Sequence, residues 1–268
     1  MQMCSELNLP HPETYFVKDN NIAELSRNIQ YPVILKPCIG SGSRGIRLIK
    51  NSNELVQKYP LIEKEYGKLI IQEYIPHGGA FGVEMLFDSK GLVCKFVHKR
   101  LREYPTSGGP STYRISTTNK FMESVSYKLV QELNWKGPVM VEFRVDSRDK
   151  IPKIMEVNGR YWGSLRCSIA AGVNFPKYHY ISATNGENKF RSYNKNICAR
   201  WEVGEIMWLI FSEGNFFDKL RVVSSRLRNS YFDFLTKDDP LPFFISLLEA
   251  SSYLFSKKGR EHSISRGW

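Results

Sequence analysis

Residues 153–164 read KIMEVNGRYWGS, an apolar run in which polar side chains recur at a fixed spacing. Glu156, Asn158 and Arg160 occupy every second position, and Gly159 interrupts the run. Because successive side chains of a strand point to opposite faces, the three polar groups are predicted to share one face. A solvated edge strand and a site for a cation and a phosphate both fit this pattern.

A second strand of the same kind precedes it, VMVEFRVD at residues 139–146. Its spacing places Glu142 on a polar face, and a tight turn through residues 146–152 can bring Glu142 beside Glu156 and Asn158. Two carboxylates and an amide oxygen are ligands that suit Mg²⁺, which completes its shell with waters and substrate phosphates. Arg160 could then hold a phosphoryl oxygen as charge develops. A polar sheet face held by ion pairs is the alternative.

Upstream, LKPCIGSGSRGI at residues 35–46 joins a lysine at a strand end to a glycine- and serine-rich loop. Such a loop lets backbone N–H groups approach phosphate oxygens, and the lysine adds a point charge. No Gly-Lys-Ser/Thr sequence ends the loop, so it is not a Walker A motif; a flexible hairpin turn is an equal alternative. The candidate phosphate-binding residues are Lys36, Gly40, Ser41, Gly42, Ser43 and Gly45.

The segment HKRLREYPTSGGPSTYR, residues 98–114, is rich in hydrogen-bond donors. Arg100 and Arg102 are candidates to bind an anion, since a guanidinium grips a carboxylate or phosphate with two parallel bonds. A basic surface hairpin is the alternative reading. His98 is interpreted as structural, because no carboxylate partner for it is evident from the sequence.

The remaining patterns favour an α+β fold in which antiparallel strand pairs mix with a few helices. A helix is predicted over residues 51–66, interrupted at Pro60. A second helix, within residues 116–135, is expected to present Phe121, Val125, Leu129 and Leu133 as its apolar face. Beyond residue 190 the chain is helix-like, aromatic and flanked by basic residues, which predicts a helical C-terminal extension that packs on the protein.

Bulk properties exclude several classes. The chain has 268 residues, five scattered cysteines and a formal net charge of +11. The cysteines form no CxxC pair, which argues against a zinc site and favours a reducing cytoplasm. No apolar run is long enough for a transmembrane segment, and no signal peptide is recognised. The basic residues are dispersed, so specific nucleic-acid binding is supported by net charge alone.

Taken in order, these motifs resemble the ATP-grasp superfamily, and most closely the predicted ATP-dependent carboxylate–amine ligases with the carbamoyl-phosphate-synthase type of ATP-grasp domain. The resemblance rests on YPVILKP and the loop after it, IIQEYIP, HKRLREYPTSGGPST, VEFRVD and MEVNGRYWGS. It implies two α+β subdomains that grip ATP, at residues 1–75 and 76–190, followed by the helical extension at 191–268.

The resemblance also implies roles for single residues. Lys36 and the loop from Gly40 to Gly45 would bind the ATP phosphates, and the backbone of Glu73 and Ile75 would lie near the adenine. The implied magnesium ligands are Glu142, Glu156 and Asn158, with Arg160 as a phosphate-binding arginine; Arg100, Arg102 and the loop from Ser107 to Ser111 are candidates for the acceptor carboxylate. The implied reaction activates a carboxylate as an acylphosphate for attack by an amine or a related nucleophile.

Two departures from the family pattern stand out. The position of an acidic residue that often reaches the ribose is held by Phe81, with Glu84 following. Family members usually carry an N-terminal domain ahead of the grasp, and a basic residue before the segment that matches Met1 to Leu7; this chain begins too late to hold either. A complete ligase, an Mg–ATP-binding module, and half of a split enzyme that needs a separate N-terminal domain or chain therefore all stay open.

Overall fold

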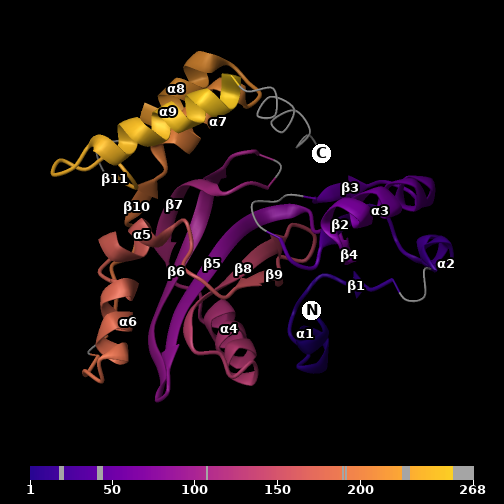
Figure 1. Ribbon diagram of the computed structural model, residues 1–268, viewed down its shortest axis with the longest axis horizontal. Coiled ribbons are helices and arrows are strands. Elements are labelled where there is room, and N and C mark those ends of the chain that lie inside the picture. The colour runs from indigo at the N-terminus through magenta and orange to yellow at the C-terminus, as the bar shows by residue number, and fades with distance from the viewer. Residues whose placement is uncertain are drawn as a thin grey trace. The chain divides into compact units, whose positions relative to one another are not determined.

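The computed structural model describes residues 1–17, 21–40, 45–106, 108–188, 190, 192–224 and 230–255, with side chains as far as residue 251. Two compact units divide the chain. Unit 1 joins Met1–Gly78 with Arg144–Met155, and unit 2 joins Gly79–Phe143 with the described residues from Glu156 to residue 255. Figure 1 labels the helices and strands of both. The subdomain boundaries at residues 75 and 190 stay a prediction.

Unit 1 contains a four-stranded antiparallel sheet in the order β1-β4-β2-β3. In its register Leu35 lies opposite Ile71, and Lys36 lies opposite Ile70. Leu35 and Ile71 are fully buried in the core that the sheet shares with α2 and α3, so Lys36 belongs to the opposite face. The elements are α1 (Gln2–Glu6), β1 (Thr14–Tyr15), α2 (Ile22–Asn28), β2 (Val33–Pro37), β3 (Arg47–Ile49), α3 (Ser52–Tyr66) and β4 (Leu69–Glu73).

Helix α3 runs through Pro60 without a break, so the predicted interruption was wrong. Asn51 caps its N-terminus by accepting a hydrogen bond from the Glu54 backbone N–H at 2.9 Å. At the other end Gly67 has φ +77° and ψ −152°, a backbone conformation that is essentially restricted to glycine, and its N–H bonds to the Glu63 carbonyl oxygen. The buried face that α3 presents to the sheet offsets the hydrogen bond that proline removes.

Unit 2 is built on a seven-stranded sheet in the order β11-β10-β7-β6-β5-β8-β9. The pairs β5–β6, β6–β7 and β7–β10 are antiparallel, and β10–β11 is parallel. In Figure 1, β5 and β6 run through this sheet as long curved neighbours. The strands are β5 (His77–Asp88), β6 (Gly91–Glu103), β7 (Ser111–Thr117), β8 (Gly137–Asp146), β9 (Pro152–Asn158), β10 (Cys198–Arg200) and β11 (Ser230–Phe232), of which β5, β8 and β9 cross the boundary between the units.

The core of unit 2 gathers large side chains from the sheet and from the helices that follow β9. Trp162 meets Phe175 edge to face with ring centroids 4.9 Å apart, and Phe96 of β6 is fully buried in the same cluster. The helices involved are α5 (Leu165–Ala170) and α6 (Phe175–Ala183). This packing fixes the chain directly after the polar strand β9.

Helix α4 (Lys120–Glu132) forms where the sequence predicts it, but its buried face differs from the prediction. Val125 and Leu129 are buried as expected, whereas Phe121 and Leu133 are 49% and 41% exposed. Met122 and Val130 complete the buried face instead. Neighbours at both three and four residues share a helix face, and a strict spacing of four drifts around the helix axis.

The predicted helical extension is present as α7 (Glu202–Phe211), α8 (Phe216–Ser224) and α9 (Leu241–Phe255). Two strands that the sequence analysis missed, β10 and β11, add this part of the chain to the sheet of unit 2. Each has three residues, which is too short for an alternating pattern to be recognised. Among the described helices, none has the length and apolar character needed to cross a bilayer.

Candidate functional site

The polar face predicted on β8 and β9 exists in unit 2. Asn158 Nδ2 donates to Glu156 Oε1 at 2.8 Å and to Glu142 Oε1 at 3.3 Å. The turn between the two strands therefore brings together all three predicted magnesium ligands. Glu156 is exposed, while Glu142 and Asn158 are half-buried.

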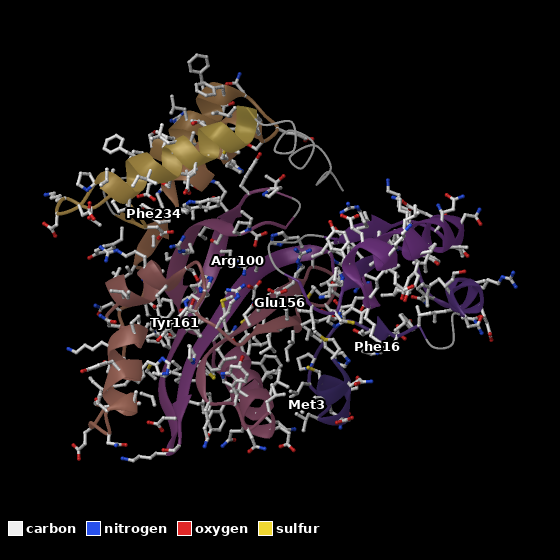
Figure 2. All side chains as sticks on the ribbon, in the orientation of Figure 1. Met3, Phe16, Arg100, Glu156, Tyr161 and Phe234 are labelled. Carbon is white, nitrogen blue, oxygen red and sulfur yellow. The ribbon has the colours of Figure 1, made fainter. Side chains whose placement is uncertain are left out.

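Arg100 of β6 completes this group on the same sheet. Its Nη2 lies 2.5 Å from Glu142 Oε2, and its Nη1 lies 3.3 Å from Glu103 Oε1. Figure 2 labels Arg100 and Glu156 and shows both on this sheet. Burial raises the pKa of Glu142 to about 7; Arg100 opposes this rise and Glu156 adds to it. Burial disfavours the charge of Arg100, but Glu142 and Glu103 outweigh it and raise the pKa of the guanidinium.

The side chains of Glu142, Glu156 and Asn158 fit a hard divalent cation. Rotation of the Asn158 amide by half a turn would exchange its N–H₂ for an oxygen and give three oxygen ligands. Two carboxylates and one amide oxygen would fill only part of an octahedral shell, which suits Mg²⁺, an ion that keeps waters and substrate phosphates among its ligands.

Arg160 lies in the turn between β9 and α5. Its side chain is exposed, and its Nη1 donates to the Tyr161 carbonyl oxygen at 2.9 Å. The turn is fixed at its start by Gly159, where an added Cβ would lie 2.5 Å from Trp135 Cη2. Arg160 thus follows Glu156 and Asn158 in a turn whose start is fixed by the close packing of Gly159 against Trp135.

In unit 1 the structure describes part of the predicted phosphate loop. Lys36 Nζ donates to the Met155 carbonyl oxygen at 3.1 Å. Gly45 has φ +75°, and an added Cβ would lie 2.8 Å from Pro37 Cγ and 3.0 Å from Tyr66 Cγ, so glycine is required there. Gly40 is exposed. Ser41, Gly42 and Ser43 lie outside the described residues, as does Ser107 of the second predicted loop.

The predicted hinge residues follow in β4 and just after it. Ile75 is buried, and the Glu73 side chain is held by Arg148 and, at 3.3 Å, by Lys153 Nζ. Burial favours the neutral form of Glu73, but the hydrogen bond from Arg148 and the other donors outweigh it and lower the pKa of this carboxyl. Glu73 and the β8–β9 turn are thus joined within unit 1.

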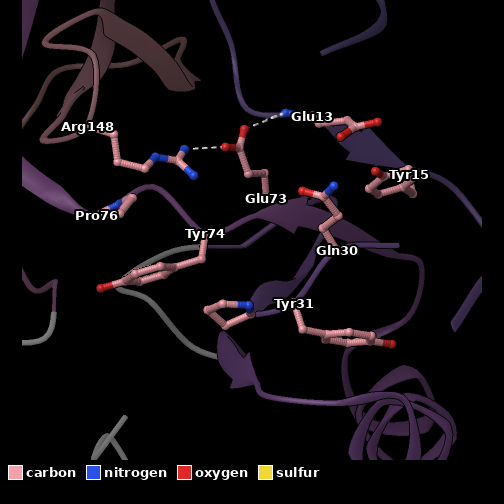
Figure 3. Close-up of a pocket in the computed structure, with 9 residues that line it drawn as sticks. Glu13, Tyr15, Gln30, Tyr31, Glu73, Tyr74, Pro76 and Arg148 are labelled. Carbon is pink, nitrogen blue, oxygen red and sulfur yellow. Dashed lines mark hydrogen bonds and ion pairs between the residues drawn. The ribbon is translucent and has the colours of Figure 1, made fainter. Parts of the chain in front are cut away.

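A pocket of about 220 Å³ lies beside this network in unit 1 (Figure 3). Glu13, Tyr31, Glu73 and Arg148 are among its lining residues. In the register of β2 and β4, Ile70 lies opposite Lys36, and Glu73 is three residues further along. The side chains of Lys36 and Glu73 therefore point to opposite faces of the sheet, and the pocket is separate from the predicted phosphate-binding face.

The structure does not bring Arg102 together with Arg100. The pairing of β6 with β7 shifts between Arg100, opposite Arg114, and Arg102, opposite Tyr113, so Leu101 is an extra residue in the ladder. This bulge turns Arg102 to the other face. There Arg102 binds Glu205 of α7 and lies 4.3 Å from the centre of the Trp208 ring. Arg200 Nη1 binds the same Glu205 carboxylate at 2.7 Å.

His98 lies beside a carboxyl group that its sequence neighbourhood does not indicate. His98 Nδ1 lies 2.9 Å from Glu84 Oε1, and both side chains are almost fully buried. Burial raises the pKa of Glu84 and lowers that of His98, so the neutral forms are favoured. Gly82 lies opposite His98 in the pairing of β5 with β6 and leaves room for the imidazole, since an added Cβ would lie 2.4 Å from His98 Cε1.

Comparison with known proteins gives one family match and several relatives. The match, to the family described as "ATP-grasp in the biosynthetic pathway with Ter operon", covers residues 65–204. Biotin carboxylase of a Nostoc species is 25% identical over 171 residues, which cover 60% of this chain and 38% of the relative. The carbamoyl phosphate synthase large chain of Pyrococcus furiosus is 27% identical over 202 residues, which cover 70% of this chain and 18% of the relative. The chain therefore spans well under half the length of either relative.

A solved structure shares the fold. The biotin carboxylase domain of Hydrogenobacter thermophilus 2-oxoglutarate carboxylase, in complex with MgADP, ADP and bicarbonate, superposes with a TM-score of 0.61. The two chains are 21% identical, and the match covers 74% of this chain and 47% of the other. At that identity the likeness establishes the fold alone.

Proposed function

Because the chain belongs to the ATP-grasp family in the biosynthetic pathway with Ter operon, matched over residues 65–204, we propose that it uses ATP to activate a carboxylate as an acylphosphate for attack by an amine or a related nucleophile. The observation that carries the proposal is the convergence of Glu142, Glu156 and Asn158 on one sheet face. Relatives named biotin carboxylase and carbamoyl phosphate synthase support the same class of chemistry.

In the proposed enzyme, Glu142, Glu156 and Asn158 hold Mg²⁺. When bound, the ion neutralises phosphate charge and orients the transferred group. The pair of carboxylates supplies the negative charge that a divalent cation requires, and the Asn158 amide supplies a neutral oxygen. Arg160 is exposed in the turn beyond them and is assigned to a phosphoryl oxygen of ATP.

The nucleotide-binding residues of unit 1 are proposed from the same family pattern. Lys36 is assigned to the phosphates of ATP. The backbone N–H groups of the loop from Gly40 to Gly45 are assigned to the same phosphates. The backbone of Glu73 and Ile75 is assigned to the adenine. The Glu73 side chain is engaged by Arg148 and Lys153, so the assignment uses its main chain.

The chemical step is an in-line transfer. An oxygen of the acceptor carboxylate forms a bond to the γ-phosphorus of ATP as the bond to the β–γ bridging oxygen breaks, and ADP leaves. The amine then attacks the acyl carbon, inorganic phosphate leaves, and the amine nitrogen loses a proton. Positioning and charge neutralisation supply most of the rate in such transfers.

Arg100 is the better placed of the two candidates for the acceptor carboxylate. It lies beside Glu142, whereas Arg102 lies beneath α7. The role of Arg102 as a substrate-binding residue stays a prediction.

The second candidate function is an Mg–ATP-binding module that needs a further domain or chain for turnover. The partial coverage of the relatives, 38% and 18% of their lengths, motivates it. Product analysis separates the two candidates. A ligase of this type releases ADP only when Mg²⁺ and an acceptor acid are present, whereas release of AMP as the main product would contradict the acylphosphate route.

Binding is tested first, by thermal unfolding with and without MgATP. A ligand specific for the folded state raises the unfolding midpoint. The rise is expected to shrink in Lys36→Ala and Glu156→Gln. It should persist in Lys64→Ala and Glu65→Gln, which change the same kinds of side chain on the exposed surface of α3. No magnesium-dependent rise in the parent protein would contradict both candidates.

A further inference from the structure

The turn at residues 159–164 is anchored at more than one point in unit 2. Its first residue, Gly159, packs against Trp135, and in its middle the Tyr161 hydroxyl pairs with His179 Nδ1 at 3.0 Å. At its end Ser164 is almost fully buried. Arg160 is exposed between these anchors, so the position of its guanidinium depends on how the turn is held.

Ser164 uses its side chain in an unusual way. It occupies the N-cap position of α5, where a serine hydroxyl commonly accepts a hydrogen bond from a backbone N–H of the first turn. No side-chain cap bond forms here. Instead Ser164 Oγ donates to Glu84 Oε1 at 3.0 Å. The end of the turn is thereby tied to β5, a strand distant in the sequence.

Glu84 accepts the hydrogen bond from Ser164 in a fully buried position. His98 Nδ1 lies 2.9 Å from the same oxygen, although it completes no hydrogen bond of good geometry there. Burial raises the pKa of this carboxyl, and the nearby Trp162 indole N–H only opposes that rise, since neither Trp162 Nε1 nor Glu84 Oε2 completes a hydrogen bond of good geometry. A carboxyl group at this depth costs stability unless its polar atoms are bonded.

From this arrangement we infer that Glu84 is a positioning residue: through Ser164 it fixes the turn that presents Arg160 to the phosphates of ATP. The inference rests on the proposed function, and it adds a residue that touches neither nucleotide nor metal. A charged side chain in a phosphoryl-transfer site acts only when its geometry is held within a fraction of an ångström. Glu84 and Ser164 provide that support from inside the sheet.

The test measures the affinity of the full chain for the β,γ-imido analogue of ATP with Mg²⁺, by isothermal titration calorimetry. Ser164→Ala removes the donor, and Glu84→Leu removes the acceptor; each is expected to weaken binding roughly tenfold. Ser164→Thr and Glu84→Gln keep the hydrogen bond and are expected to restore most of the affinity. Ser168→Ala is the control, since this buried serine donates to Leu165 O within its own helix at 2.8 Å.

A double-mutant cycle separates positioning from a general loss of structure. If Glu84 acts through Arg160, Ser164→Ala has no further effect on affinity once Arg160→Ala is present. If binding by that variant is too weak to measure, Arg160→Lys is the background, and there the effect of Ser164→Ala is expected to be smaller than in the parent protein. An equal loss in both backgrounds overturns the inference, and so does parent-like binding by Ser164→Ala. If the parent protein fails to bind the analogue, the proposed function itself fails, an outcome distinct from normal parent binding with unaffected variants.

Discussion

Arg100 Nη2 and Glu142 Oε2 lie 2.5 Å apart, so the guanidinium assigned to an acceptor carboxylate contacts a carboxylate of the candidate magnesium set. Both side chains are largely buried, with 14% and 18% of their surface exposed. The pair joins β6 to β8, strands that are separated by β5 in the sheet. Its removal therefore affects both the site and the stability of the sheet.

We expect Arg100→Gln to lower the free energy of unfolding by about 3 kcal/mol, because it leaves a buried carboxylate without its cation. Chemical denaturation measures the loss. Lys99→Gln, an exposed position on the same strand, should cost less than about 0.5 kcal/mol. The double variant Arg100→Gln with Glu142→Gln should lose less than the sum of the single losses; simple additivity would show that the two groups do not interact.

Glu205→Ala is expected to destabilise the protein by about 3–5 kcal/mol, since two guanidiniums, those of Arg102 and Arg200, lose their shared carboxylate inside the protein. Denaturant titration checks this. The matched variant Glu213→Ala removes an exposed glutamate shortly beyond the same helix and should be near neutral. Equal stability of the two variants would show that α7 is not held through Glu205.

Gly45→Ala should be destabilising for two reasons, its φ of +75° and the 2.8 Å approach of the new Cβ to Pro37 Cγ. Gly67→Ala tests the effect of a positive φ without crowding, because φ of Gly67 is +77° and nothing lies within 4 Å of the added carbon. The conformational cost alone is about 1–3 kcal/mol, and the crowded position should exceed it. Thermal or denaturant unfolding that ranks Gly67→Ala as the more damaging would contradict this account.

Asp146 predicts a dependence of stability on pH. Arg148 donates to this carboxylate from its backbone N–H and from its guanidinium, which holds the pKa of Asp146 well below its usual range. A carboxylate with a lowered pKa in the folded state stabilises the fold at neutral pH, and this contribution is lost as the pH falls below the ordinary range of an aspartate. The free energy of unfolding should therefore decline in acid.

In Asp146→Asn, the part of the acid-induced decline that comes from the Asp146 carboxylate should be absent. The free energy of unfolding at pH 7 should be lower than that of the parent protein by about 1–3 kcal/mol. Denaturation curves between pH 7 and pH 3 measure both effects. Asp238→Asn, which alters an exposed carboxylate, should keep the parental profile. A parental profile in Asp146→Asn would exclude this carboxylate as a source of the acid sensitivity.

Local patterns in the sequence predict the elements that carry the site. Period-two spacing on two strands, joined by a short turn, is sufficient to bring Glu142, Glu156 and Asn158 together. The strand that carries Lys36 and the helix predicted over residues 51–66 are equally local. These predictions succeed because each depends on neighbouring residues and on a spacing that the backbone imposes.

Features that depend on pairing between distant segments could not be predicted from local sequence patterns. The extra residue at Leu101 leaves no mark in the alternation of HKRLREY, yet it sends Arg100 and Arg102 to opposite faces. The contact of Glu84 with Ser164 joins residues 80 positions apart. In each case the deciding information is the register between strands or the packing of a turn, which no short window of sequence contains.

Arg102 and Arg200 bind the same Glu205 carboxylate, and this affects where the chain can be shortened. The family match ends at residue 204, a natural place to cut a minimal fragment. Such a fragment would keep both guanidiniums and lose the carboxylate that they share, together with the Trp208 ring that packs on Arg102. The two positive charges would then lie close together without their common counter-charge, which favours unspecific binding of anions. A fragment extended through α7 and β11 retains these contacts.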